Sequence, residues 1–321
     1  MLIFDKCINY AATNFLGPLS EFGVSFPHLR QDAVKTMLTK DAPIRIESSN
    51  ASEAVFYYQK NTLLKAINND AMLFFIRAML QGDTVKRMTA NYSTNWCLVS
   101  DYYYGFYLSG LLLRLCLRGT VYLDDKTKRD IQRVITAHSG RVSAIGNNCF
   151  FIANIDDKAC EYKLTLTSSS NLRTHELVWT QVDHLLLLLE KTCSENSDEQ
   201  TVLKSIEQIN NAIGCTYPAK LRNKLNYHPY YSVREVNKEY SRPVNSVDWL
   251  DPILFFDRHY EDRDQSNINL VTSYIYYLQQ LTFCLLNKYD SMRGRASGIL
   301  SSINKYKEEK IVLPTVSFTY R

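Results

Sequence analysis

Glycine and proline are scarce in this chain, with 11 Gly and 8 Pro in 321 residues. Folds built from many short strands need frequent tight turns, and those turns depend on these two residues. The scarcity therefore weighs against a turn-rich β fold and favours long helices. The 22 Tyr and 14 Phe are consistent with this preference for helices. A content of 45% hydrophobic and 22% charged residues is typical of a globular protein.

Long apolar runs are also missing. The most apolar stretch, 102–117, is interrupted by Arg114 and falls short of a membrane span. The N-terminal Met-Leu-Ile-Phe-Asp-Lys has no basic segment followed by a long apolar core, which a secretion signal requires. We therefore expect a soluble, cytoplasmic protein without a membrane partner.

The chain lacks the common motifs that bind metals, cofactors or reactive substrates. Its 8 Cys include no CxxC pair, and Cys116 and Cys284 lie in apolar helical runs, as buried reduced thiols do. There is no GxGxxG, no Walker A loop, no HExxH and no Gly-x-Ser-x-Gly. Nucleotide hydrolysis, dinucleotide chemistry and esterase chemistry therefore have no support, and we expect no metal and no cofactor.

The net charge of +4 is small but unevenly distributed. Residues 219–243 hold six Lys or Arg against two acidic residues, and residues 288–321 hold seven against three. The remainder of the chain is therefore net negative. Two basic segments would suit a phosphate backbone, although a solvated basic helix face has the same pattern. The candidate RNA-binding cations are Lys220, Lys224, Arg293 and Arg295.

Residues 218–231 gather several kinds of polar side chain around one short helix. Pro218 suits the first turn of a helix, where a missing N–H costs nothing. Pro229 disfavours α geometry at His228, so the helix is expected to end near Tyr227. A guanidinium, two amides and an imidazole then lie within about two helical turns, in the order Arg222, Asn223, Asn226 and His228.

Arg222, the polar Asn223 directly after it, and His228 after five intervening residues match the arginine–histidine signature of HEPN domains. On these residues the chain resembles a family of all-helical modules that cleave or bind RNA in toxin–antitoxin and antiviral systems. Tyr230, two residues after the histidine, also fits the version of the motif found in HEPN toxins paired with nucleotidyltransferases.

The resemblance implies a mainly α fold, a HEPN-like helical bundle, and a toxin or antiphage-defence effector that cleaves RNA without metal through the RNA's own 2′-hydroxyl. His228 would transfer protons, Arg222 would stabilise the developing phosphate charge, and Asn223 or Asn226 would orient the phosphate. Supporting residues would be Asn226, Tyr227 and Tyr230. The expected partners are RNA, a second copy in a homodimer, and an antitoxin, nucleotidyltransferase or other defence-system protein.

Two alternatives stay open at the same residues. Arg222, Asn226 and Tyr227 also resemble the Arg-x-x-x-Asn-Tyr pattern of HEPN relatives without the histidine. That pattern implies a non-catalytic scaffold that binds RNA or protein. In the plainest alternative, Arg222 caps or salt-bridges a bundle helix and His228 is an ordinary loop histidine.

Hydrophobic spacing and capping signals organise the rest of the chain. We expect an N-terminal segment 1–48, a first helical part 49–140, a β-hairpin insertion 141–170, and a second helical part 171–321 with the motif and a basic tail. The expected helices are 50–81, 95–118, 124–138, 172–192, 197–213, 218–227 and 267–289, with a short strand at 44–46. Helix 95–118 is apolar on nearly every side and should be central.

The β-hairpin is predicted by alternation in residues 149–154 and 162–167 around an acidic turn. Glu161 and Lys163 superficially match the carboxylate–lysine arrangement of metal-dependent nucleases, which is a third hypothesis. They are more simply the solvated face of a strand. The buried face would consist of Tyr162, Leu164 and Leu166.

Two further features have a weaker bearing on function. The stretch from Tyr103-Tyr104-Gly105 to His138-Ser139-Gly140 also resembles a YaaC-like bacterial family, which implies a HEPN-like bundle without assured catalysis. His175 and His184 lie nine residues apart on one expected helix. They are not spaced as a metal pair, so we interpret them as core or boundary histidines.

Overall fold

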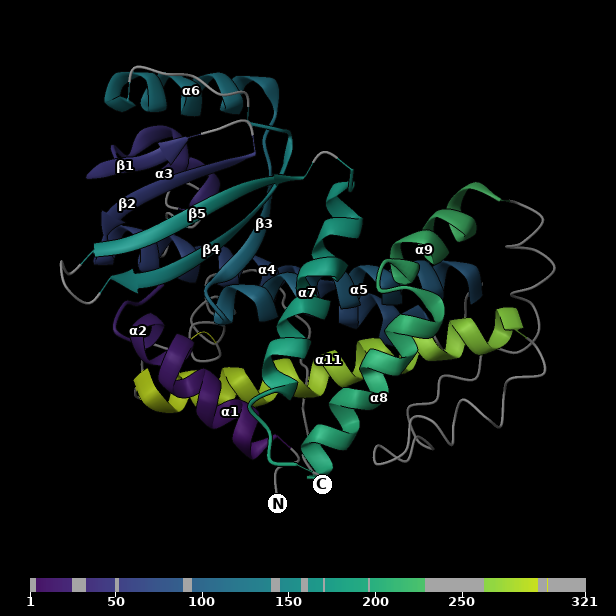
Figure 1. Cartoon of the computed structure of the whole chain (residues 1–321). Coiled ribbons are helices and arrows are strands. Elements are labelled where there is room, and N and C mark those ends of the chain that lie inside the picture. The colour runs from purple at the N-terminus through teal and green to yellow at the C-terminus, as the bar shows by residue number, and fades with distance from the viewer. Residues whose placement is uncertain are drawn as a thin grey trace.

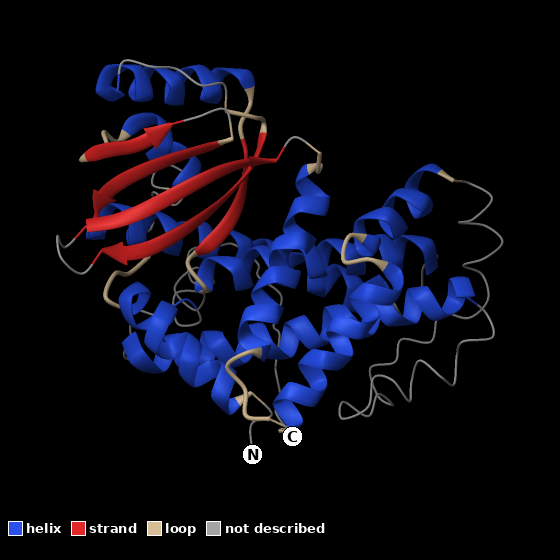
Figure 2. Cartoon of the chain, in the orientation of Figure 1, coloured by secondary structure: helices blue, strands red, loops and turns tan. Residues whose placement is uncertain are grey.

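The computed structural model describes residues 4–24, 33–49, 52–88, 94–139, 145–156, 161–169, 171–195, 197–228, 263–293 and 299. Helices make up most of these residues, and one antiparallel sheet of five strands lies beside them (Figure 2). The mainly α fold expected from the sequence is confirmed at this level.

Figure 1 labels the elements in chain order. The helices are α1 (Asp5–Ala11), α2 (Gly17–Ser20), α3 (Val34–Lys40), α4 (Lys60–Met88), α5 (Thr94–Leu115), α6 (Asp125–Ser139), α7 (Thr174–Glu190), α8 (Asp198–Ile213), α9 (Tyr217–Tyr227) and α11 (Arg263–Arg293). A π-helical turn, η1 (Ala12–Leu16), joins α1 to α2. The strands are β1 (Arg45–Ser49), β2 (Glu53–Gln59), β3 (Arg118–Tyr122), β4 (Asn148–Asp156) and β5 (Glu161–Ser169).

Helix α5 is the central helix, as its apolar sequence predicts. It packs against α4, α7, α9 and α11. Two glycines permit this close packing, because a Cβ at Gly105 would lie 2.5 Å from Cγ1 of Ile275 on α11, and one at Gly110 would overlap the ring of Phe74 on α4. One hydrophobic core joins α5 to the sheet and to the remaining helices.

The sheet has the order β1-β2-β5-β4-β3, with antiparallel neighbours throughout. Strands β4 and β5 form the predicted hairpin, and they are inner strands because β5 also pairs with β2 and β4 with β3. Tyr162, Leu164 and Leu166 on β5 are buried, which confirms the predicted inward face.

The opposite face of β5 carries cross-strand ion pairs. Glu161 Oε2 accepts from Arg45 Nε at 3.3 Å, and Lys163 Nζ lies 3.7 Å from Glu47 Oε2. Within the described residues, Glu161 belongs to no group of three metal-ligating side chains. This geometry is that of a solvated strand face, and it gives the metal-nuclease hypothesis no support.

Several expected helix boundaries are wrong. Helix α4 continues through Gly82 to Met88 rather than ending at residue 81, and α11 spans Arg263–Arg293 rather than 267–289. Residues 53–59 form β2 rather than the start of the helix expected at 50–81, and Arg118 begins β3 rather than ending the helix expected at 95–118. β2 is rich in aromatic side chains, which favour a strand when a neighbouring strand is present. β2 has two such neighbours, the adjacent strand β1, where Arg45 pairs with Tyr57, and the distant strand β5, where Thr167 pairs with Glu53.

The caps of the later helices agree with the sequence. Ser197 Oγ accepts from Gln200 N at 3.2 Å at the start of α8. Gly214 follows the end of α8 with φ +87°, a conformation that glycine adopts without strain. Helix α9 has Pro218 in its first turn and ends at Tyr227, as predicted.

Asp124 caps helix α6, as expected, and this cap predicts a pH effect. Its Oδ1 accepts from Thr127 N at 2.8 Å, and its Oδ2 accepts from Lys35 Nζ at 2.7 Å. These bonds, the one from Lys35 first, hold the pKa of Asp124 well below its ordinary value. The stabilisation is therefore present above the unfolded-state pKa of about 3.9 and is lost as the pH falls below it.

We expect Asp124→Asn to lower the melting temperature at pH 6 and to have progressively less effect as the pH falls from 4 toward 2. Thermal unfolding of both proteins across this range measures the difference. A gap that is constant or widens on acidification would contradict the role of the carboxylate. Asp130→Asn, at an exposed ion pair with Arg133 on the same helix, is the matched control.

Candidate functional site

Helix α9 holds Arg222 against the central helix. Leu221 and Leu225 are buried, and α9 packs on α5 and α7. The Arg222 guanidinium donates through Nε (3.2 Å) and Nη2 to the hydroxyl of Tyr103 on α5, and through Nη1 to Asn223 Oδ1 at 2.9 Å. A guanidinium has five N–H donors. Within the described residues these bonds use three of them, and two remain for a ligand.

The other residues of the sequence motif lie toward the end of α9. His228 is the residue after the helix, is exposed, and donates its backbone N–H to Lys224 O at 3.0 Å. Asn226 is half-buried and Tyr227 is 69% exposed. His228 is six residues after Arg222, or about 9 Å along a helix axis. No hydrogen bond joins their side chains in the part of the chain that the structure describes.

An imidazole that the motif does not include lies near Arg222. His175 is in the first turn of α7, and its Nδ1 lies 2.8 Å from the hydroxyl of Tyr102. Its ring packs on Phe106 with centroids 4.5 Å apart and meets Tyr103 edge-on at 6.1 Å. Tyr103 also binds Arg222, so the imidazole and the guanidinium share one aromatic neighbour. We call the following residues the Arg222–His175 site: Tyr102, Tyr103, Phe106, His175, Arg222 and Asn223.

The Tyr102 hydroxyl suits a histidine that changes its protonation state. Trp179 Nε1 donates to this hydroxyl at 3.5 Å. Because a hydroxyl both donates and accepts, Tyr102 can donate to a neutral Nδ1 and can accept from a protonated Nδ1–H. Burial raises the pKa of Tyr102 above its ordinary value, so its hydroxyl keeps its proton at neutral pH.

The electrostatics of the site favour a neutral imidazole. Burial lowers the pKa of His175 below its ordinary value, and the positive charge of Arg222 lowers it further. The uncharged ring therefore predominates at neutral pH and can accept a proton. The site thus combines an anion-binding guanidinium with a proton acceptor.

The predicted RNA-binding cations are not gathered in one place. Lys220 is exposed on α9, and Lys224 Nζ lies 6.0 Å from the ring centroid of Tyr217 on the same helix. Arg293 ends α11, and its Nη1 donates to Ser20 O of α2 at 2.8 Å. Figure 1 places that end of α11 across the molecule from α9.

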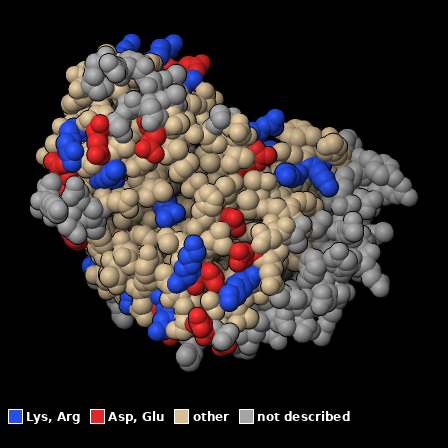
Figure 3. All heavy atoms as spheres, viewed as in Figure 1, with Lys and Arg blue, Asp and Glu red and all other residues tan. Residues whose placement is uncertain are grey.

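Two predicted residues and much of the predicted basic charge are outside the described ranges. Tyr230 and Arg295 both lie there, as do most cations of segments 219–243 and 288–321. On the face shown in Figure 3, the described Lys and Arg side chains are interspersed with Asp and Glu rather than clustered. The described surface on this face therefore offers no broad basic patch.

Sequence reasoning missed His175, and only a weak signal was present. His175 precedes Trp179 by four residues, which places both on one face of α7. The sequence interpretation used only its nine-residue distance from His184, which is not the spacing of a metal pair. Its approach to Arg222 depends on the packing of α5, α7 and α9, which are distant in the sequence.

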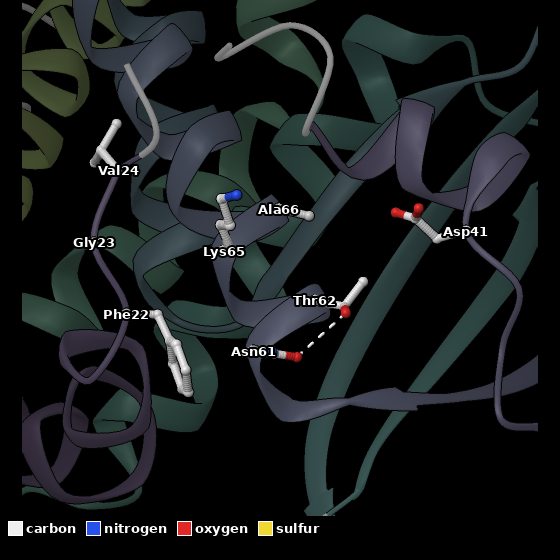
Figure 4. Close-up of a pocket in the computed structure, with 8 residues that line it drawn as sticks. All are labelled: Phe22, Gly23, Val24, Asp41, Asn61, Thr62, Lys65 and Ala66. Atoms are coloured by element: carbon white, nitrogen blue, oxygen red, sulfur yellow. Dashed lines mark hydrogen bonds between the residues drawn. The ribbon is translucent and has the colours of Figure 1, made fainter. Parts of the chain in front are cut away.

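A separate cavity of about 540 Å³ lies between α2, α3 and α4. Figure 4 shows Asp41 at the end of α3 on one side and Lys65 of α4 projecting toward the open space. The volume is within the range of small-molecule sites. The full lining is Phe22, Gly23, Val24, Asp41, Asn61, Thr62, Lys65 and Ala66, with no imidazole or thiol among them.

The described helices include none that is long and apolar enough to cross a lipid bilayer. Comparison of the chain with protein-family models, with curated proteins and with solved structures found no match.

Proposed function

We propose that this protein is a metal-independent endoribonuclease of the HEPN type that acts as a toxin or antiphage-defence effector. The observation that supports the proposal is the Arg222–His175 site, where a guanidinium that uses three of its five donors within the described residues lies near an imidazole held by a hydroxyl. RNA carries its own nucleophile, so a site of this kind needs only to bind phosphate and transfer protons.

Each residue has a defined task in this reaction. Arg222 binds the scissile phosphate and stabilises the charge that develops in the transition state, while Tyr103 and Asn223 hold the guanidinium in place. His175 takes the proton of the 2′-hydroxyl, since its lowered pKa keeps the neutral ring available. His228, exposed beyond α9, then gives a proton to the departing 5′-oxygen. The products are a 2′,3′-cyclic phosphate and a free 5′-hydroxyl.

Such an enzyme needs restraint, because uncontrolled RNA cleavage harms the cell that makes it. A homodimer in which two copies of the site face a shared cleft would provide one level of control. An antitoxin, a nucleotidyltransferase or another defence-system protein would provide a second. Tyr230 is a modification site only if a nucleotidyltransferase partner exists.

A second candidate function is a non-catalytic HEPN-like scaffold that binds RNA or protein. The observation that favours it is the engagement of Arg222 by Tyr103 and Asn223, together with the exposed position of His228 away from those bonds. In this case the arginine mainly joins α9 to α5. RNA binding would then persist without any cleavage.

The test is cleavage of end-labelled single-stranded RNA by the full chain in EDTA. We expect wild type to leave cyclic-phosphate ends, and we expect Arg222→Ala to lower the rate by about 10²–10³-fold, the usual effect of removing a charge-stabilising donor. His228→Ala tests the proton donor. Arg133→Ala removes an exposed arginine on α6 and should change nothing.

The possible results separate the two candidates. Cleavage that requires Mg²⁺, or that survives Arg222→Ala unchanged, would overturn the ribonuclease proposal. Absence of cleavage with measurable RNA binding would favour the scaffold. Toxicity on expression that is lost in Arg222→Ala or His228→Ala would instead indicate an enzyme that needs a partner or trigger.

A further inference from the structure

Two cysteines and a glutamate from three different helical segments meet at one place in the fold. Cys7 is on α1, Cys193 follows the end of α7, and Glu199 is in the first turn of α8. One potential ligand atom from each residue lies within 4.8 Å of the other two. Figure 1 shows α1 and the adjoining ends of α7 and α8 together at the lower side of the molecule.

The spacing of the two sulfurs matches a shared metal ion. Cys7 Sγ and Cys193 Sγ are 3.4 Å apart. Two thiolates on one tetrahedral zinc ion, each about 2.3 Å from it, are separated by about 3.8 Å. A disulfide would require about 2.05 Å. The distance between the two sulfurs must therefore increase only slightly for both to bind one zinc ion. It would have to decrease by a larger amount for a disulfide to form.

The carboxylate of Glu199 is buried without a positively charged side chain paired with it in the described residues. Its side chain is 6% exposed, and its Oε1 accepts the backbone N–H of Lys6 at 2.7 Å. Its Oε2 is buried and accepts no hydrogen bond within the part of the chain that the structure describes. The ion pairs within the described ranges do not include Glu199. Burying a carboxylate without a counter-charge is costly, and a bound cation removes that cost.

A second polar group beside the cluster also lacks a partner. Tyr277 of α11 packs against Phe4 with ring centroids 5.3 Å apart, and its buried hydroxyl has no hydrogen-bond partner. Tyr277 is on α11, which packs against α1, the helix that carries Cys7. Two unsatisfied buried polar groups therefore lie at one thiol pair, where a metal ion with a bound water would give each of them a partner.

A catalytic thiol is a poorer explanation of the same residues. Cys7 is 1% exposed, and burial raises its pKa far above that of a reactive cysteine. The carboxylate of Glu199 would also repel a thiolate in the absence of a cation. Metal coordination instead makes use of both thiols and the carboxylate together.

We propose that Cys7, Cys193 and Glu199 form a zinc-binding site that fastens α1 to the junction of α7 and α8. On binding, hydrated Zn²⁺ exchanges water ligands for two thiolate sulfurs and Oε2, and the two thiol protons pass to solvent. A remaining water takes the fourth position, as is usual when the protein supplies three ligands. Coordination gives the buried Oε2 of Glu199 a direct contact with the cation, while the net charge of the cluster is unchanged because Zn²⁺ replaces the two thiol protons.

This site is separate from the Arg222–His175 site. His175 begins α7 and Cys193 lies beyond its other end, so the length of the helix, about 22 Å from its second to its last residue, separates them. The zinc site therefore takes no part in the proposed RNA cleavage. The zinc content of the protein is measured in the absence of RNA. The zinc proposal and the ribonuclease proposal can therefore fail independently of each other.

The test measures zinc in the full chain, purified under reducing conditions without chelators. We expect about one zinc per chain by elemental analysis, and an absorption band from thiolate–cobalt charge transfer when Co²⁺ replaces zinc. Cys193→Ser and Glu199→Gln should weaken zinc binding at least about 100-fold in competition with a chelating dye. Added Zn²⁺ should raise the melting temperature of the stripped wild type and not that of Cys193→Ser.

Cys215→Ser is the matched control, because Cys215 is half-buried like Cys193 but lies outside the cluster. It should bind zinc as wild type does. Wild-type protein that retains no zinc and shows no thiolate–cobalt band would overturn the proposal, as would equal zinc binding by wild type and Cys193→Ser. Isolation of the protein with a Cys7–Cys193 disulfide under the same reducing conditions would also overturn it.

Discussion

Replacing His175 with alanine is expected to lower the rate of RNA cleavage by about 10²–10⁴-fold, the usual contribution of a positioned acid or base. The affinity for RNA should change little, because Arg222 and its two remaining donors are untouched. Single-turnover cleavage and fluorescence-anisotropy binding measure the two effects separately. Equal losses of binding and cleavage would show that His175 supports the fold of the site rather than the chemistry.

His184→Ala is the control for this substitution. His184 is on the same helix, nine residues later, but is exposed and is not part of the site. Its loss should leave cleavage unchanged. Tyr102→Phe adds a finer test, since it removes the hydroxyl that holds Nδ1 while keeping the ring that packs against His175. We expect an intermediate loss of rate from Tyr102→Phe.

The electrostatics of His175 give a readout that does not depend on activity. Burial and then the charge of Arg222 lower its pKa, so its midpoint in an NMR titration should lie below the ordinary value of about 6.5. Arg222→Met removes the charge and should move that midpoint upward. The folded protein binds the proton less readily than the unfolded chain, so this group costs stability as the pH falls below about 6.5. A midpoint that does not respond to Arg222→Met would contradict the coupling between the two residues.

The sequence predicted those parts of the fold that local signals control. The ends of α8 at Ser197 and Gly214, and the start of α9 at Pro218, were predictable from the sequence. A helix cap depends on only a few neighbouring residues. The β4–β5 hairpin was predictable for the same reason, since both strands and their turn are contiguous. Strand β3 was missed because its partner β4 lies about thirty residues later in the chain. Strand β2 was missed although its partner β1 is adjacent, because the Asn50–Glu53 capping signal was interpreted as the start of a helix.

The candidate site shows the same division. The position of Arg222 and Asn223 on one short helix follows from the sequence, and so does the end of that helix before His228. The hydroxyl of Tyr103, 119 residues away, could not be assigned to Arg222 from spacing. The packing of α5, α7 and α9 determines which imidazole lies near Arg222. In the structure that imidazole belongs to His175.

Arg114 presents the largest expected effect on stability. The sequence shows it only as an interruption of an apolar helix, but the side chain is 2% exposed in the structure. Its Nη2 lies 3.3 Å from Asp70 Oδ2 on α4 and donates to Thr120 O on β3 at 2.8 Å. Its Cζ lies 4.2 Å from the ring centroid of Phe74. One guanidinium therefore joins α4 and α5 to the sheet.

We expect Arg114→Ala to lower the free energy of unfolding by about 3–5 kcal/mol, the usual cost of leaving one member of a buried ion pair alone. Burial raises the pKa of the Asp70 carboxyl even though the Arg114 guanidinium is nearby. The loss of hydration therefore destabilises the ionised carboxylate more than the guanidinium stabilises it. Without Arg114, Asp70 would keep that cost and lose its main counter-charge, while the backbone N–H of Val34 and the charge of Arg77 would still favour the carboxylate. Urea unfolding, with the midpoint compared at constant slope, measures the change.

Two comparisons separate the ion pair from simple loss of side-chain volume. The double variant Arg114→Met with Asp70→Leu should be more stable than Arg114→Ala, because it removes both charges and refills the space with apolar atoms. Arg133→Ala should cost less than about 1 kcal/mol, since that arginine is 79% exposed and pairs with Asp130 in solvent. If Arg114→Ala and Arg133→Ala cost the same, the buried guanidinium does not hold the helices to the sheet.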